Sequence, residues 1–224
     1  MFVHLKTKTI YSLLEGAIFA KALADQCRKF KMPAVGIADR ANLFGALEFS
    51  EVLSDNGIQP IIGCQLPMSF KEADLKKLRA TERISMLFLA KNELGYRNLM
   101  ELSSKFFLNE TYRFEGMSIR EIDKLSDGLI CLSGGDESPI NNLLKDNKIK
   151  EAENLLLHFK RTFGDRFYLE MNRHPLGENY SNKMNIEENI LELADKQRLP
   201  LVATNDVYFL EKKLHQPHDA LLCI

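Results

Sequence analysis

The chain has 224 residues, enough for one large α/β domain or two small ones. Hydrophobic residues make up 45% and charged residues 27%, which is ordinary for a globular protein. The formal net charge of −1 excludes a protein that binds nucleic acid through bulk charge neutralisation. No apolar run approaches the roughly 18 residues of a membrane span, and no signal-peptide pattern precedes the first predicted strand.

The four cysteines are far apart and include no C-x-x-C pair. They are Cys27, Cys64, Cys131 and Cys223. Such spacing is typical of reduced thiols in a cytoplasmic protein, with neither a metal nor a redox role. We therefore expect thiols in or near the core and a cytoplasmic location.

Short apolar runs alternate with amphipathic stretches along the chain, which predicts strands alternating with helices. The predicted strands are Phe2–Leu5, Ala34–Ala38, Pro60–Cys64, Met86–Ala90, Gly128–Ser133, Phe167–Met171 and Leu201–Thr204. The predicted helices are Ala17–Lys31, Ala46–Asn56, Leu94–Phe107, Lys148–Phe163 and Ile186–Arg198. This order indicates an α/β protein with parallel pairing, right-handed crossovers and a barrel-like sheet.

Glycines and prolines mark several ends of these elements. Asn56-Gly57 and Phe163-Gly164 are typical helix stops, whereas Pro33 and Pro200 precede strands. An open doubly wound sheet is the alternative fold. It requires a glycine-rich phosphate loop after the first strand, and Lys6–Ser12 contains no glycine.

Three segments depart from this alternation. Ser69–Arg83 is highly charged, so we expect a solvated surface insertion. Phe107–Ser118 is mixed aromatic and polar and is expected to lead into a short helix. Gln216–Ile224 begins a helix with a proline and stops in mid-pattern, which suggests that the chain is part of a longer protein.

In (β/α) barrels the functional groups follow the C-terminal ends of the strands. The residues at those positions here are mostly cationic or uncharged rather than metal-ligating. The candidate site residues are Lys6, Lys8, Glu15, Asp39, Arg40, Gln65, Ser85, Gly135, His174, Asp206 and Tyr208. Lys6 and Lys8 are two positions apart on a strand, so their ammonium groups should project to the same side as His4.

Five segments resemble the polymerase-and-histidinol-phosphatase (PHP) domain found at the start of bacterial replicative DNA polymerases. They are GIADRANLFGALEF (Gly36–Phe49), PIIGCQ (Pro60–Gln65), LAKNELGYRNLMEL (Leu89–Leu102), GLICLSGG (Gly128–Gly135) and LPLVATNDVYF (Leu199–Phe209). The resemblance covers essentially the whole chain in the correct order. It implies a distorted (β/α)7 TIM-like barrel, with residues 1–224 forming one PHP domain of a longer polymerase.

The resemblance also implies that most of the family's metal positions are replaced. Lys6, Lys8, Arg40, Ser85 and Tyr208 stand where the family has histidine, Gln65 stands for a glutamate, and Gly135 for a cysteine or histidine. Glu15 and Asp206 remain as possible ligands, and His174 aligns with a family histidine. A protonated lysine has no lone pair for zinc, and a zinc site needs about three or four converging donors. These positions are therefore vestigial, and we expect no metal and no catalytic residue in this domain.

A second hypothesis concerns what stabilises these positions. We expect Lys6, Lys8 and Arg40 to pair with Asp39, Asp206 and Glu15, with fixed cations in place of metal ions. Several alternatives remain open. The lysines could be solvated at the rim, or they could bind a phosphate or a nucleic-acid backbone. Asp39 could make an Asx-type bond to Ala41–Phe44, and Tyr208 with Phe209 could serve only in packing.

The function implied by the resemblance is that of an inactive scaffold domain, which docks the separate proofreading 3′–5′ exonuclease (an epsilon-type subunit). The full protein would be a DNA-directed DNA polymerase whose Mg²⁺ and catalytic carboxylates lie outside these residues, and which meets DNA and other replisome subunits. One alternative is a residual metal-dependent phosphoesterase or 3′–5′ exonuclease. The other is a binding module unrelated to replication.

Overall fold

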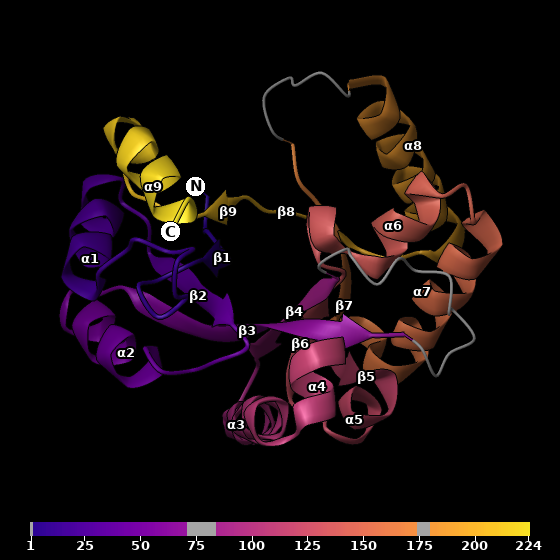
Figure 1. Ribbon diagram of the computed structural model, residues 1–224, viewed down its shortest axis with the longest axis horizontal. Coiled ribbons are helices and arrows are strands. Elements are labelled where there is room, and N and C mark those ends of the chain that lie inside the picture. The colour runs from indigo at the N-terminus through magenta and orange to yellow at the C-terminus, as the bar shows by residue number, and fades with distance from the viewer. Residues whose placement is uncertain (1, 71–83, 174–179) are drawn as a thin grey trace. The chain divides into compact units, whose positions relative to one another are not determined.

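The computed structural model describes residues 2–70, 84–173 and 180–224, except for the side chains of 180–185. The predicted insertion beyond Phe70 and the candidate residue His174 lie outside the described residues. The chain divides into two compact units. The first unit is Met1–Gln65 together with Asn205–Ile224, and the second unit is Leu66–Thr204 (Figure 1).

The first unit joins the two ends of the sequence in one parallel set of strands. Its elements are β1 (Lys6–Thr7), α1 (Ala20–Lys29), β2 (Ala34–Arg40), α2 (Ala46–Asp55), β3 (Gln59–Ser69, up to Gln65), β9 (Asp206–Val207), a 3-10 turn at Lys212–Leu214, and α9 (His215–Leu222). The strand order is β3-β2-β1-β9, so β9 pairs with β1 although it comes from the far end of the sequence.

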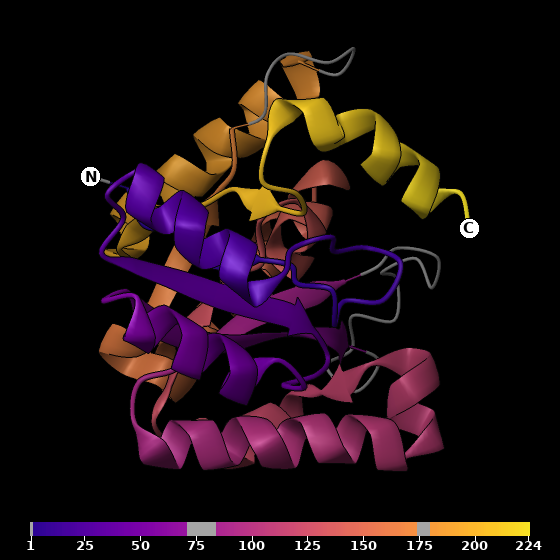
Figure 2. The same ribbon diagram turned by 90° about the vertical axis from the view of Figure 1, so that its left-hand side faces the viewer.

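The core of the first unit lies between these strands and the two helices. Leu23 and Cys27 on α1, and Phe49 and Leu53 on α2, are four residues apart and fully buried or nearly so. Figure 2 shows α1 and α2 side by side against the strands. Burial of these apolar helix faces, rather than helix propensity alone, stabilises the unit.

The second unit contains the remaining strands and most of the helices. Its elements are β4 (Ser85–Ala90), α3 (Glu93–Leu108), α4 (Glu110–Glu115), β5 (Met117–Ser118), α5 (Ile119–Lys124), β6 (Leu129–Leu132), a 3-10 turn at Gly135–Glu137, α6 (Pro139–Lys145), α7 (Ile149–Phe163), a 3-10 turn at Gly164–Arg166, β7 (Phe167–Met171), α8 (Tyr180–Gln197) and β8 (Leu201–Ala203). Strands follow the order β8-β7-β6-β4, and β5 pairs with the end of β3.

An aromatic cluster forms part of the core of the second unit. The ring centroid of Phe159 lies 5.7 Å from that of Phe167 and 6.5 Å from that of Phe163, and Phe88 lies 6.0 Å from Phe163. These four phenylalanines are almost completely buried. Their rings pack α7 against strands β4 and β7 of the sheet.

The structure corrects two predictions about the strands. The strand predicted at Phe2–Leu5 is instead β1 at Lys6–Thr7, because those two residues have backbone partners in register on neighbouring strands. The prediction of parallel pairing throughout is wrong at β4 and β6, which are antiparallel. An apolar run predicts that a strand is buried but carries no information about the direction of its neighbour.

The remaining differences are smaller. The helix predicted at Ile186–Arg198 begins six residues earlier, at Tyr180. Helix α6 was not predicted. It begins with Pro139 after Ser138, whose side chain accepts hydrogen bonds from the backbone N–H groups of Ile140 and Asn141. Across the described part of the chain, no helix has the length and apolar character needed to span a membrane.

The prediction of thiols in or near the core is confirmed at three cysteines and wrong at Cys223. Cys27, Cys64 and Cys131 are buried free thiols, while Cys223 is exposed. Burial raises the pKa of the Cys64 thiol to about 12 and that of Cys27 to about 11. Both groups are therefore protonated at neutral pH and unreactive.

Candidate functional site

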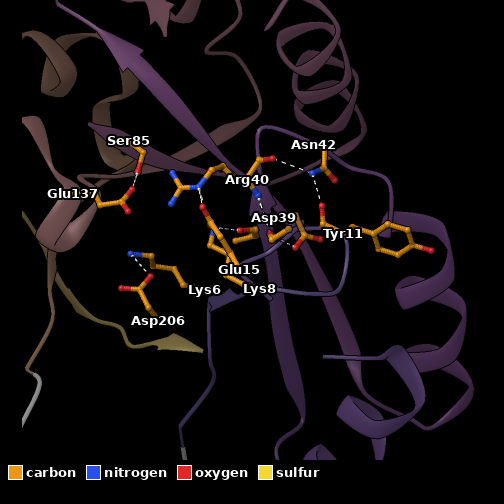
Figure 3. A network of polar contacts seen from close by, with 12 residues as sticks. Lys6, Lys8, Tyr11, Glu15, Asp39, Arg40, Asn42, Ser85, Glu137 and Asp206 are labelled. Atoms are coloured by element: carbon orange, nitrogen blue, oxygen red, sulfur yellow. Dashed lines mark hydrogen bonds and ion pairs between the residues drawn. The ribbon is translucent and has the colours of Figure 1, made fainter. Parts of the chain in front are cut away.

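Lys6 and Lys8 lie on and just after β1 and are buried, with 1% and 0% of their surfaces exposed. The register of β1 against β9 places Lys6 directly opposite Asp206. The Nζ of Lys6 lies 2.9 Å from Oδ1 of Asp206 (Figure 3). An ammonium group removed from water is costly unless it is paired, and this carboxylate supplies the opposite charge. The alternative that Lys6 and Lys8 are solvated is therefore wrong.

Lys8 has a different partner. Its Nζ donates a hydrogen bond of 2.5 Å to the backbone oxygen of Ala38 on β2. Burial, together with the positive charges of Arg40 and Lys6, lowers the pKa of Lys8 to about 8, and the negative charges of Asp39 and Asp206 only partly oppose this shift. At pH 7 Lys8 is still mostly protonated.

The carboxylate of Asp39 is buried and held by hydroxyl and backbone donors. It accepts hydrogen bonds from the backbone N–H of Thr9 (2.7 Å), the hydroxyl of Thr9 (2.6 Å) and the hydroxyl of Ser12 (2.6 Å). The predicted Asx-type bond of Asp39 is therefore wrong. Asn42 makes that turn instead, since its Oδ1 accepts from the N–H of Phe44 at 3.1 Å.

Arg40, at the end of β2, forms an ion pair with Glu15 in the loop after β1. The Nε of Arg40 lies 2.9 Å from both carboxylate oxygens of Glu15, and both side chains are largely buried. The expected pairing of cations with carboxylates is thus present for Lys6 with Asp206 and for Arg40 with Glu15. Figure 3 shows both pairs. The expected pairing is wrong for Lys8 and Asp39 in the described part of the chain, because Lys8 donates to a backbone oxygen and Asp39 accepts from Thr9 and Ser12.

Tyr208 contributes packing and a backbone contact. Its backbone oxygen accepts a hydrogen bond of 2.9 Å from the N–H of Ala17, and its ring centroid lies 5.6 Å from that of His218. Phe209 also packs against His218, at 5.1 Å. Both aromatic rings thus pack against His218, as the packing alternative predicts. Gln65 is buried, and its backbone oxygen accepts from the N–H of Ala41 at 2.9 Å.

His218 on α9 was missed by the sequence reasoning. It is buried, and its Nε2 lies 2.7 Å from the backbone oxygen of Glu15. A histidine within an apolar helix is a signal for a buried polar contact, but its partner is far away in the sequence. The contact positions the loop that carries Glu15.

In the second unit, polar residues gather where β4 begins and where β6 and β7 end. The hydroxyl of Ser85 donates to Oε2 of Glu137 at 2.5 Å. The buried carboxylate of Glu170 accepts from the N–H of Gly134 at 3.1 Å and from the hydroxyl of Thr204 at 2.5 Å. Glu137, Glu170 and Thr204 were not among the predicted site residues. Glu137 and Glu170 lie outside the five matching segments, and Thr204, although inside Leu199–Phe209, does not stand at a predicted ligand position.

Gly135 has a backbone conformation and close neighbours that leave no room for a side chain. It has a φ of +58°, and a Cβ placed there would lie 2.7 Å from Nδ2 of Asn172 and 3.0 Å from Oε1 of Glu170. A cysteine or histidine at this position would therefore strain the backbone and displace its neighbours. Gly135 suits a packed loop rather than a ligand position.

The residues present do not fit the metal centre that the family implies. The ammonium groups of Lys6 and Lys8 have no lone pair while protonated. Within the part of the chain that the structure describes, no group of three or more His, Cys, Asp or Glu side chains is placed to hold a metal ion. Carboxylates such as Glu15 and Asp206 instead face nitrogen cations.

Comparison with known proteins identifies the family. Residues 4–174 match the PHP domain. The chain belongs to the PHP family. It is 44% identical over 224 residues to DNA polymerase III subunit alpha of Caulobacter vibrioides, 36% to that of Rickettsia bellii, and 33% over 225 residues to that of Borreliella burgdorferi. The whole chain is covered, but it spans only 19%, 18% and 19% of these relatives, respectively.

Two solved structures share the fold. An amidohydrolase from Chromobacterium violaceum, with bound sulfate and no metal, has a TM-score of 0.54 at 10% identity, covering 98% of this chain and 96% of that one. A protein of Bifidobacterium adolescentis assigned as a metal-dependent phosphoesterase has a TM-score of 0.52 at 14% identity, covering 94% and 88%. The predicted fold class, a distorted (β/α)7 TIM-like barrel of the PHP type, is confirmed.

Proposed function

We propose that this chain is a metal-free, non-catalytic PHP domain that serves as a scaffold within a replicative DNA polymerase alpha subunit. The alpha subunits that match the whole chain support the polymerase context. Residues 1–224 then form one domain of a longer polypeptide, which works in the cytoplasm.

The observation that carries the proposal is the ion pair between Lys6 and Asp206. Its 2.9 Å separation places a buried cation against a carboxylate that would otherwise be available to a divalent ion. Lys8, just after the same strand, is also buried. The positive charges of these two lysines would repel a metal ion, and their protonated amines offer it no lone pair. The ammonium group neutralises the carboxylate, as a bound metal ion could, but it does not act as a Lewis acid.

In this proposal the domain binds another subunit, and catalysis takes place outside these residues. The domain stabilises the polymerase body and docks a separate epsilon-type proofreading exonuclease. Nucleotide transfer uses Mg²⁺ bound by carboxylates outside these residues, and contact with DNA and other replisome subunits is made by the full-length protein. A domain without its own hydrolytic site is consistent with proofreading by another chain.

Metal analysis and a hydrolysis assay test the metal-free, inactive state. The full-length protein is incubated with Zn²⁺ or Mn²⁺, desalted and analysed for metal, and a phosphodiester substrate is assayed with and without Mn²⁺. We expect no stoichiometric metal that depends on Asp206, and no turnover that Asp206→Asn abolishes. Metal-dependent turnover lost in Asp206→Asn would instead establish the alternative, a residual phosphoesterase or 3′–5′ exonuclease.

A binding measurement tests the scaffold role. The full-length protein should co-elute with the exonuclease subunit of the same organism, and removal of residues 1–224 should abolish this complex. A matched control deletes an equally long segment elsewhere while retaining these residues. If the exonuclease binds undiminished without residues 1–224, the docking role is wrong.

A further inference from the structure

The loop after β1 and the first turn of α2 both expose apolar side chains. Leu13 and Leu14, in the loop after β1, are 79% and 53% exposed, and Leu47, in the first turn of α2, is 70% exposed. We call these three residues the leucine patch. Single exposed leucines are common, but three large ones on two segments that contact each other through Tyr11 indicate an interaction surface.

Tyr11 connects the loop after β1 to the segment that leads into α2 by specific contacts. The ring of Tyr11 packs over Gly45, where an added Cβ would lie 2.7 Å from Cδ2 of the tyrosine. The hydroxyl of Tyr11 donates to Glu48 at 2.9 Å. The backbone oxygen of Tyr11 accepts from the side-chain amide of Asn42 at 3.0 Å (Figure 3). The leucine patch therefore stands on an ordered base rather than on loose loops.

The backbone beneath the patch is strained. Leu14 has a φ of +61° and Ala41 a φ of +58°, and an L-residue with a side chain adopts this region only at a cost. Strained positions persist where the surrounding structure enforces them, and they concentrate at binding sites. Here Leu14 remains more than half exposed, so the strain does not serve to bury its side chain.

The surface next to the patch is acidic. Along α2, Leu47 is followed by Glu51 and Asp55, spaced four and eight residues away on the same helix face. Glu51 and Asp55, with Ser50 and Ser54, line a surface depression of about 520 Å³. Helix α2 carries no basic residue to neutralise them.

We infer that the leucine patch and the acidic depression together dock a segment of a separate protein that is apolar at one end and basic at the other. Its apolar side chains cover Leu13, Leu14 and Leu47, and a lysine or arginine enters the depression about 6–12 Å along α2. The acidic flank disfavours nucleic-acid phosphate and matches a cationic protein segment. The inference goes beyond the scaffold proposal, because it depends only on this surface.

The test uses the full-length protein and a synthetic peptide with two leucines followed, two helical turns later, by two lysines. Binding is measured by fluorescence anisotropy. We expect saturable binding that weakens as salt is raised, because the charged contact is exposed. A peptide with glutamate in place of both lysines should bind at least tenfold more weakly.

Variants locate the site. Leu13→Ser combined with Leu47→Ser, and separately Glu51→Lys combined with Asp55→Lys, should each raise the dissociation constant at least tenfold. The matched control is Leu108→Ser combined with Phe114→Ser, which removes two residues that are each 86% exposed in the second unit and should leave binding unchanged. All of these positions are exposed, so circular dichroism should show unchanged folding.

Several results would overturn the inference. Equal binding of the lysine and glutamate peptides, or equal loss in the Leu108/Phe114 control, would show non-specific apolar adsorption. Concentration-dependent self-association that the Leu13/Leu47 variant abolishes would make a second copy of the chain the occupant. Absence of peptide binding, together with a lower melting temperature of the Leu13/Leu47 variant, would mean that another part of the same polypeptide covers the patch.

Discussion

Lys6 and Asp206 face each other across the pairing of β1 with β9, with 2.9 Å between the ammonium nitrogen and the carboxylate oxygen. The lysine is 1% exposed and the aspartate 17%. This pair joins the beginning of the chain to its last strand. It therefore links the two ends of the sequence within the first unit by an ion pair between paired strands.

Removal of one member of this pair should be costly. Lys6→Met leaves the Asp206 carboxylate without this cation and should lower the free energy of unfolding by about 2–4 kcal/mol. Lys6→Met combined with Asp206→Leu should recover most of the loss, since both charges are removed. Chemical denaturation of Lys6→Met, Asp206→Leu and the double variant measures this, with Lys196→Met as a control at an exposed ion pair. Additive single and double losses would refute the coupling.

Thr7 and Thr9 form a matched pair for buried hydroxyls. The hydroxyl of Thr7 is buried and has no hydrogen-bond partner among the described residues, whereas that of Thr9 donates to Asp39 and accepts from the N–H of Tyr11. Thr7→Val should be neutral or stabilising by up to about 1 kcal/mol, because an unsatisfied polar group is removed. Thr9→Val should destabilise by about 1–3 kcal/mol. Thermal unfolding measures both, and a reversed order would contradict the hydrogen-bond assignment.

The buried amine of Lys8 predicts a specific pH dependence. Its folded pKa of about 8 lies below the ordinary value of 10.5, so the unfolded chain binds more protons between these two pH values. Stability should therefore rise with pH through this window, whereas below pH 8 the cost of the buried charge is fully present. The gain amounts to at most about 3 kcal/mol.

Comparison with Lys8→Met isolates this contribution. The variant retains every other titrating group, so the difference in unfolding free energy between the two proteins should change from pH 8 to pH 10.5 and be flat below pH 7. Urea denaturation at several pH values measures this difference. A constant difference across the whole range would mean that the pKa of Lys8 is not lowered.

Gly16 should be intolerant of any side chain. A Cβ at this position would lie 2.0 Å from the backbone oxygen of Thr9, which cannot move without disturbing the contacts of Asp39. Gly16→Ala should cost more than about 2 kcal/mol. Gly57→Ala, where the φ of +71° is strained but no atom lies within 4 Å, should cost about 1 kcal/mol. Equal losses in the two variants would argue against the close approach.

The amino-acid sequence by itself determined the local features of this protein. Gly57 and Gly164 end helices with positive φ as predicted, because a residue without Cβ enters that region freely. The cations at Lys6, Lys8 and Arg40 and the PHP-type motifs could also be read directly, since residue type and spacing are written in the chain.

Only the tertiary structure decided which groups meet. The partner of Lys6 depends on the register of β1 with β9, the donors to Asp39 come from the neighbouring loop, and His218 reaches Glu15 from the last helix. Likewise, the antiparallel pairing of β4 with β6 depends on how strands are arranged in the sheet. Strand pairing and buried polar contacts join residues far apart in the sequence, so neither periodicity nor local motifs specify them.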